Sequence, residues 1–284
     1  MNLQLQDEVK RLKKVTDELA SILEALMSKI KDAKEEADQG AAGNSWPAAA
    51  ASSRFAASNQ SAPIGLDQDP LHLKDRLAGS MSNLDIISIV GMGGIGKTTL
   101  ARNLYDDPLT EEHFDIRAWV VVSQNYHMQE LLTILVNSTR QYGGEVHNKS
   151  VDELVVRLYK NLKGRRYLIV MDDVWDTKAW DDVKRFFPDD NNSSRIILNT
   201  RQSEEATYAN PRSPIHHMNL LSPESSWDLL RGTVFGQEDC PYAMEKIGRK
   251  IAESCKGLPL AIVVIGGLLT KDINEEDWSA SHKT

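Results

Sequence analysis

A glycine-rich stretch that ends in a lysine and a threonine has the spacing of a phosphate-binding loop. In GMGGIGKT, residues 91–98, the fixed positions of the pattern G-x-x-x-x-G-K-[ST] are filled by Gly91, Gly96, Lys97 and Thr98. A chance match in a chain of this length has a probability on the order of one per cent. The apolar run IISIV precedes the loop, and the helical pattern TTLARNL follows it. The sequence therefore predicts a phosphate site at a strand-to-helix turn.

The residue types in this loop indicate what it binds. Its glycines, which include Gly93 and Gly94, let backbone N–H groups close around the β-phosphate of a nucleotide, and the helix N-terminus adds partial positive charge. The ammonium group of Lys97 is expected to reach the β- and γ-phosphates, and the hydroxyl of Thr98 is expected to bind Mg²⁺. A glycine-rich structural turn is the weaker alternative, because the loop has the flanking strand and helix that nucleotide binding requires.

Two acids and an arginine end later apolar runs. Asp172 and Asp173 close the run YLIVMDD, and open α/β sheets bind ligands at the C-terminal ends of their strands. Since a phosphate loop needs a carboxylate for its magnesium shell, Asp172 is the predicted metal-side acid. Asp173 is the catalytic candidate, which would orient an attacking water. Arg201 ends the run RIILNTR and is a candidate γ-phosphate sensor, with a solvated surface residue as an equally weighted interpretation.

The elements that must position these residues follow from apolar periodicity. Between residues 63 and 213, short apolar runs alternate with amphipathic helical patterns, which predicts parallel βαβ units. The expected fold class is α/β, a P-loop NTPase parallel sheet with helices on both faces. Beyond this nucleotide-binding domain the strands are expected to stop. A small helical subdomain is predicted over residues 214–278, with His216 and His217 in a structural turn, and a tail over residues 279–284.

The N-terminal part of the chain has a different composition. Apolar residues at steps of three and four run through residues 1–38, which predicts a coiled-coil-type helix that pairs with a partner helix or with a second copy. An amphipathic helix that packs on its own domain is an equally weighted interpretation. Residues 39–62 are rich in alanine, serine and glycine, and this composition predicts a flexible linker.

Composition and charge exclude several classes of partner. The net charge of -8 and the sequence pI near 5.4 disfavour nucleic acid as a ligand. No signal peptide is expected, and the longest apolar run, residues 258–269, is shorter than the roughly 20 residues that cross a bilayer. Cys240 and Cys255 have no metal-ligand spacing and are expected to be free thiols in a reducing compartment. These features predict a cytoplasmic protein without a transmembrane segment.

An ordered series of motifs resembles the NB-ARC domain of plant coiled-coil, leucine-rich-repeat disease resistance proteins. GMGGIGKTTLA is similar to the phosphate loop of that family, FDIRAWVVVSQNY to its next signature and YLIVMDDVW to its second kinase motif. SSRIILNTR, LLSPESSWDLLRGTVFG and KGLPLAIVVIGGLL complete the series, which runs over about residues 64–278. Within the family, the late-blight resistance group is the most similar.

The resemblance implies a nucleotide switch that holds ADP at rest and ATP when active, in a receptor for the plant defense response. Hydrolysis, if present, is expected to be slow and to serve the switch. The family roles are phosphate and Mg²⁺ binding for Lys97, Thr98 and Thr99, Mg²⁺ binding for Asp172, γ-phosphate sensing for Arg201, and proximity to the base for Ile64, Gly65 and Pro259.

The chain departs from the family pattern at both ends, which leaves other functions open. The winged-helix subdomain and the leucine-rich repeats of the family are absent from the 284 residues, and the N-terminal side has room for only the last helix of the family's N-terminal domain. A truncated receptor is therefore expected. One alternative is an adaptor or decoy that acts through residues 1–38 without a productive nucleotide cycle. Another is a phosphate-transferring enzyme with a diffusible substrate.

Overall fold

The computed structural model describes residues 69–79, 82–122, 126–139, 149–237, 240 and 242–281. The predicted N-terminal helix, the linker, and the candidate residues Ile64 and Gly65 lie outside the described residues. The chain divides into two compact units. The sheet unit contains the described residues up to 225 together with Leu258–Ala261, and the helical unit contains those of 226–257 and 262–281.

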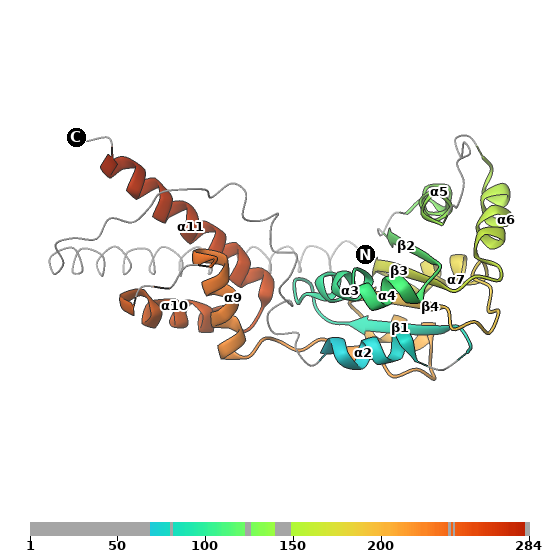
Figure 1. Ribbon diagram of the computed structural model, residues 1–284, viewed down its shortest axis with the longest axis horizontal. Helices are drawn as coiled ribbons and strands as arrows, with labels where there is room; N and C mark the ends of the chain where they lie inside the picture. The colour runs from blue at the N-terminus through green and yellow to red at the C-terminus, as the bar shows by residue number, and fades with distance from the viewer. Residues whose placement is uncertain are drawn as a thin grey trace, which may run out of the picture. The chain divides into compact units, whose positions relative to one another are not determined.

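The sheet unit is built on five parallel strands in the order β2-β3-β4-β1-β5. Figure 1 labels the strands β1 to β4. This arrangement confirms the predicted α/β fold class. The chain leaves the C-terminal end of β1 toward the far edge at β2, and β5 lies on the opposite side of β1, so the topology changes direction at β1. The strands are β1 Asp85–Val90, β2 Ile116–Val121, β3 Tyr167–Val174, β4 Arg195–Thr200 and β5 His216–His217.

The strand β5 corrects the expectation that strands stop before residue 214. His216 and His217 pair in parallel with Ile89 and Val90 of β1, whereas the sequence predicted a structural turn at these histidines. A strand of two residues is too short to carry a period of its own, which is why the sequence pattern did not reveal it. The next residue, Met218, continues the connection to β1 by donating its backbone N–H to the carbonyl of Val90 at 2.8 Å.

Helices cover both faces of the sheet, because alternate residues of each buried strand point to opposite sides. Helices α2 (Asp69–Ala78) and α3 (Lys97–Tyr105) pack on the face that carries Ile89 and Ile197. Helices α5 (Met128–Ser138), α6 (Val151–Leu162) and α7 (Thr177–Lys184) pack on the face that carries Ile196 and Leu198. Two short helices complete the unit, α4 (Pro108–His113) and α8 (Ser203–Ala209). The inner strands β3 and β4 are therefore buried on both faces along nearly their whole length, and binding to them is left to the strand ends.

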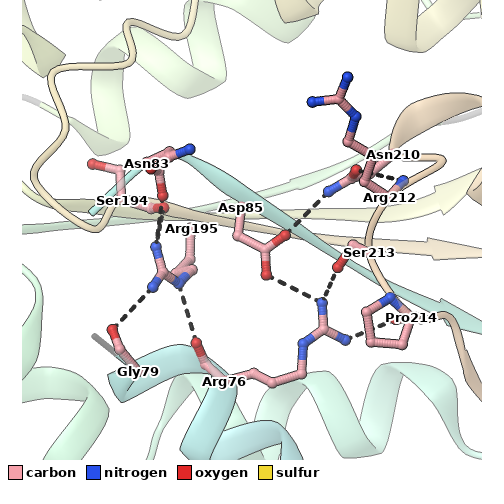
Figure 2. A network of polar contacts seen from close by, with 10 residues as sticks. All are labelled: Arg76, Gly79, Asn83, Asp85, Ser194, Arg195, Asn210, Arg212, Ser213 and Pro214. Atoms are coloured by element: carbon pink, nitrogen blue, oxygen red, sulfur yellow. Dashed lines mark hydrogen bonds and ion pairs between the residues drawn. The ribbon is translucent and has the colours of Figure 1, made fainter. Parts of the chain in front are cut away.

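A polar network at the N-terminal ends of β1 and β4 attaches α2 to the sheet (Figure 2). Arg195 is 1% exposed, and its guanidinium donates to the carbonyl oxygens of Arg76, Gly79, Asn83 and Ser194 at 2.9–3.1 Å. Burial lowers the pKa of Arg195. The planar fork of five N–H donors matches this ring of carbonyls, so that the C-terminal end of α2 and the segment before β1 are fixed to the sheet.

Arg76 and Asp85 extend the same network toward the segment before β5. The guanidinium of Arg76 lies 3.1 Å from the carboxylate of Asp85 and donates to the carbonyl of Pro214 at 2.8 Å and to the hydroxyl of Ser213 (Figure 2). Asn210 donates to the other oxygen of Asp85 at 3.1 Å. The carboxylate thereby joins α2 to the segment that follows α8.

The helical unit consists of α9 (Pro223–Phe235), α10 (Tyr242–Ser254) and α11 (Pro259–Ser281), although the first residues of α9 and of α11 belong to the sheet unit. Two glycines allow close helix contacts. A Cβ on Gly248 would lie 2.3 Å from the ring of Trp227, and one on Gly266 would lie 2.7 Å from the methyl of Thr233. No helix of the described chain has both the length and the apolar character needed to cross a membrane.

Candidate functional site

The predicted phosphate loop connects β1 to α3 and contains glycines that no other residue can replace without strain. Gly94 and Gly96 have φ angles of 77° and 105°, in the left-handed region that L-residues rarely adopt. A Cβ on Gly94 would also lie 2.7 Å from the Cβ of Leu260. Gly91 has a close neighbour as well, since a Cβ added at this position would lie 2.9 Å from the side chain of Met218. The backbone of the loop is therefore wound tightly at the C-terminal end of β1.

The N-terminus of α3 is arranged to bind an anion. Its N-cap residue is Gly96, so no cap side chain accepts a hydrogen bond from the N–H groups of the first turn, and this turn contains no acidic residue. The N–H groups at the start of a helix have no intrahelical acceptor and carry partial positive charge. Thr99 lies in this first turn and is exposed. An oxyanion held by the loop would meet both the free N–H groups and the helix dipole.

Lys97 is held within the loop by backbone carbonyl groups. Its side-chain nitrogen donates to the carbonyl oxygens of Gly91 and Met92 at 2.7 and 3.1 Å, and the residue is only 8% exposed. Burial lowers the pKa of the ammonium group, and Arg201 lowers it further by repulsion, whereas Asp173 and Asp172 raise it. A phosphate oxygen would supply the negative partner that this buried cation lacks among the loop carbonyls.

Asp172 of β3 connects to both α3 and β4 through side-chain hydrogen bonds. The hydroxyl of Thr98, at the start of α3, donates to its two carboxylate oxygens at 3.1 and 3.0 Å. Asn199 of β4 donates from Nδ2 to Oδ1 at 2.8 Å. The carboxylate and hydroxyl oxygens are ligands of the kind that Mg²⁺ prefers, and the two residues already touch, so Thr98 and Asp172 fit a magnesium ion beside a bound phosphate. These are the partners that the sequence predicted for the metal.

Asn199 is a site residue that sequence reasoning missed. It is fully buried, and its Oδ1 has no hydrogen-bond partner among the described residues. Because the Nδ2 group must face the carboxylate of Asp172, the Oδ1 is the atom left to accept a hydrogen bond from a ligand or a water. The available signal was a polar residue directly after the apolar run IIL, two positions before Arg201.

A bulge at the end of β3 determines the direction of Asp173. Between Met171 and Val174 the strand β3 advances by three residues while its partner β4 advances by two. Asp173 has a φ of 58°, in the left-handed region. In a regular strand the side chains of neighbouring residues point to opposite faces, whereas an extra residue in a bulge re-aims the following side chains. Asp172 thus faces Thr98, and Asp173 faces Arg201.

Arg201 lies between Asp173 at the Nε edge of its guanidinium and Trp175 at one of its faces. Its Nε lies 3.5 Å from Oδ1 of Asp173, and its Cζ lies 4.2 Å from the centre of the Trp175 ring. A Cβ on Gly93 would lie 3.6 Å from Nη1 of Arg201. The arginine therefore reaches the phosphate loop, as a γ-phosphate sensor must. Sequence reasoning assigned no role to Trp175, which donates from Nε1 to Oδ2 of Asp173 at 3.0 Å.

The segment Leu258–Ala261 belongs to the sheet unit although it lies far along the chain. The backbone N–H of Leu260 donates to the carbonyl of Gly94 at 3.1 Å. Pro259, predicted to lie near the base, is therefore adjacent to a residue that contacts the phosphate loop. Of the predicted site residues, only Ile64 and Gly65 have no place among those described.

The fold and the loop together define a P-loop nucleotide-binding domain. The model of the NB-ARC domain family matches residues 67–240. The chain belongs to the NB-ARC family, as the resemblance of its motifs predicted.

Relatives in Solanum demissum support this assignment. The chain is 43% identical to a putative late blight resistance protein homolog over 208 residues, which is 73% of this chain and 17% of that protein. It is 41% identical to a second relative, a late blight resistance protein, over 216 residues, which is 76% of this chain and 17% of that protein. The matched part thus spans about a sixth of the length of these relatives.

Solved structures with a similar fold have little sequence in common with the chain. Cdc6p from Pyrobaculum aerophilum aligns with a TM-score of 0.54 at 12% identity, covering 81% of this chain and 65% of Cdc6p. The ADP form of the ORC2 protein from Aeropyrum pernix aligns with a TM-score of 0.53 at 18% identity, covering 78% of this chain and 64% of ORC2. At these identities the likeness shows the fold alone.

Proposed function

We propose that this chain is the ADP/ATP switch of a plant disease-resistance receptor. The observation that carries the proposal is the contact of the buried acid Asp172 with Thr98, at the start of a helix without a capping side chain. Lys97, the first residue of the same helix, donates to a carbonyl of the preceding loop. A lysine, a hydroxyl and a carboxylate so arranged bind the phosphates and the Mg²⁺ of a nucleotide. The family membership and the names of the relatives support the assignment to disease resistance.

In this proposal the loop residues hold the part that ADP and ATP share. The N–H groups at the start of α3 contact the β-phosphate, the ammonium of Lys97 neutralises it, and Thr99 contacts it from the first helical turn. Thr98 and Asp172 hold Mg²⁺ through their oxygens. Pro259, Ile64 and Gly65 lie around the base, and Pro259 is next to the residue that hydrogen bonds to the loop.

The acidic and basic pair beside the loop distinguishes the two nucleotides. Arg201 lies close enough to Gly93 to contact a γ-phosphate, which ADP lacks. Asp173 orients the attacking water in a slow hydrolysis that returns the switch to ADP. Both carboxylate oxygens of Asp173 already have partners, one in Trp175 and one in Arg201. The attacking water would have to compete with these two partners for the carboxylate, which is consistent with a switch rather than a fast enzyme.

The remaining parts of the proposal concern the protein as a whole. ADP is held at rest and ATP in the active state, in the cytoplasm, as in an intracellular receptor of the plant defense response. Residues 1–38 contribute self-association or a contact with a partner helix. The alternative, an adaptor acting through residues 1–38 without a nucleotide cycle, makes the opposite prediction for nucleotide binding.

Calorimetric titration of the purified chain with ADP and with the slowly hydrolysed analogue ATPγS, each with Mg²⁺, tests the proposal. Lys97→Ala is expected to weaken both nucleotides by about thirtyfold or more, because it removes a charge-assisted contact worth roughly 2 kcal/mol. Lys178→Ala, which removes an exposed lysine of α7, is the matched control and should leave both affinities unchanged. Unchanged binding in Lys97→Ala would overturn the proposed switch and favour the adaptor.

A further inference from the structure

Trp175 contacts both members of the charged pair beside the phosphate loop. It follows directly after β3, and its indole N–H donates to Oδ2 of Asp173 at 3.0 Å. The face of the same ring lies against the guanidinium of Arg201, with 4.2 Å from its centre to Cζ. The side chain of Arg201 is 45% exposed, so water surrounds much of it. One aromatic side chain thus orders the carboxylate by its edge and the cation by its face.

These contacts determine which edge of the guanidinium faces the loop. The Nε edge of Arg201 points toward Asp173, at 3.5 Å from Oδ1. Its Nη1 approaches the loop, at 3.6 Å from the position of a Cβ on Gly93. Since the guanidinium is planar and rigid, fixing its plane and its Nε edge also fixes the direction of its terminal nitrogens. A long side chain without such a support would lose more rotamer entropy when it binds a phosphate.

We propose that Trp175 is the positioning residue for Arg201, which holds the guanidinium at the loop so that its terminal nitrogens meet the third phosphate of ATP. The inference rests on the proposed function of the loop and adds a residue that contributes to the discrimination between ATP and ADP. Trp175 acts through Arg201 and Asp173 and contacts no phosphate itself. Its contribution is selective, because ADP lacks the phosphate that Arg201 would bind.

A positioning role and a merely structural role predict different changes in the affinities for ADP and ATP. If Trp175 only filled space at the end of β3, its removal would lower the stability of the sheet unit and weaken ADP and ATP alike. If it orients Arg201, its removal weakens the triphosphate selectively, and the effect depends on the presence of Arg201. A double-mutant cycle between the two residues separates these roles.

The test is the affinity of the purified chain for Mg²⁺–ADP and Mg²⁺–ATPγS, measured by calorimetry. Trp175→Ala is expected to weaken ATPγS by about threefold to fivefold, the size of a partly exposed cation–π contact, with ADP unchanged within about twofold. Trp175→Phe keeps the aromatic face and should restore most of the loss. In an Arg201→Ala background, Trp175→Ala should cause no additional loss. Thermal unfolding of each variant reports on the fold, and Trp175→Leu replaces the alanine variant if that one unfolds.

Tyr208→Ala is the matched control, since it removes an exposed aromatic ring that lies near Lys184 in the same unit, with 5.4 Å between the ring centre and Nζ. It should leave both affinities unchanged. Equal weakening of ADP and ATPγS by Trp175→Ala, tighter ATPγS binding, or additive losses in the double variant would overturn the inference. These outcomes are distinct from failure of the switch itself, which is shown by Lys97→Ala retaining both nucleotides.

Discussion

At the scale of single residues, the site depends on side chains that have more than one partner. Asp172 accepts hydrogen bonds from Thr98 and from Asn199, so that α3, β3 and β4 meet at one carboxylate. Lys97 donates to two loop carbonyls and lies close enough to Arg201 for repulsion between the two cations. A bound polyphosphate would offset that repulsion, because it places negative charge between the two side chains.

The pH dependence of nucleotide binding should report the protonation of Lys97. Its pKa lies below the ordinary value of 10.5, with burial as the largest cause. As the pH rises through this lowered pKa, the free protein loses the ammonium proton that phosphate binding needs. ADP affinity should therefore start to decline before the pH reaches 10.5, the ordinary pKa of lysine. For folding the sign is opposite: the unfolded chain holds this proton more tightly, so the burial penalty on stability is relieved as the pH rises between the two pKa values.

Calorimetric titration with ADP from about pH 7 to about pH 10 measures the decline in affinity. Lys97→Arg keeps its charge over this whole range and should show a flatter profile, even with a weaker affinity at neutral pH. An equally steep decline in Lys97→Arg would assign the pH dependence to another group.

At the scale of elements, the loop and the bulge of β3 place backbone in the left-handed region where the site requires it. Gly94 and Gly96 accept this conformation without strain, whereas Asp173 adopts it with a side chain at a cost of roughly 1 kcal/mol or more. The bulge lets two consecutive acids serve two different partners. A regular strand would direct only one of them to the side of α3.

Gly94→Ala should disable the loop, because it adds a Cβ at a φ of 77° and at 2.7 Å from the Cβ of Leu260. We expect a loss of stability of about 1–3 kcal/mol and at least about tenfold weaker ADP binding. Gly267→Ala, in α11, is the matched control. Nothing lies within 4 Å of its Cβ position, so it should preserve ADP binding and raise helix stability by up to about 1 kcal/mol.

Urea unfolding and ADP titration of both variants check this prediction. Equal effects of the two substitutions would show that the conformation of the loop at Gly94 is not what ADP binding requires.

At the scale of the whole molecule, hydrogen bonds connect segments that lie far apart in the sequence. Leu260 donates to the carbonyl of Gly94, so the chain that forms α9 and α10 returns to the phosphate loop. At the opposite ends of β1 and β4, the network around Arg195 and Asp85 joins α2 to the segment before β5 (Figure 2). Segments that are distant in the sequence thus contact both ends of the central strands of the sheet unit.

Removing the guanidinium at the centre of that network should destabilise the sheet unit. Arg195→Met leaves the partly buried carbonyl groups of Arg76, Gly79 and Asn83 without their donor, and an unsatisfied buried group costs about 1–3 kcal/mol. We expect a decrease in the free energy of unfolding of at least about 3 kcal/mol. Arg212→Met removes an exposed arginine of the same region and should change it by less than about 0.5 kcal/mol.

Chemical unfolding followed by circular dichroism measures both variants. A loss in Arg195→Met no larger than that in Arg212→Met would contradict a stabilising role for the network.

The sequence by itself determined the features that are written in contiguous residues. The phosphate loop with Lys97 and Thr98, its flanking strand and helix, the α/β class and the acid Asp172 all follow from fixed spacing and local periodicity, which a short segment carries by itself. The contact of Thr98 with Asp172 was also predictable, because parallel strands end at one edge of the sheet. The expected helix over residues 1–38 stays a prediction, as do the domain boundaries and the roles of the site residues.

Only the tertiary structure decided which distant residues meet. Asn199 reaches Asp172 because β4 lies beside β3 in the order β2-β3-β4-β1-β5, and neither local pattern specifies that order. The bulge turns Asp173 toward Arg201 and Trp175, since hydrogen-bond register depends on both strands. Leu260 reaches Gly94 through packing rather than through spacing. Local periodicity specifies elements, but contacts between elements depend on how their faces pack, which no single segment encodes.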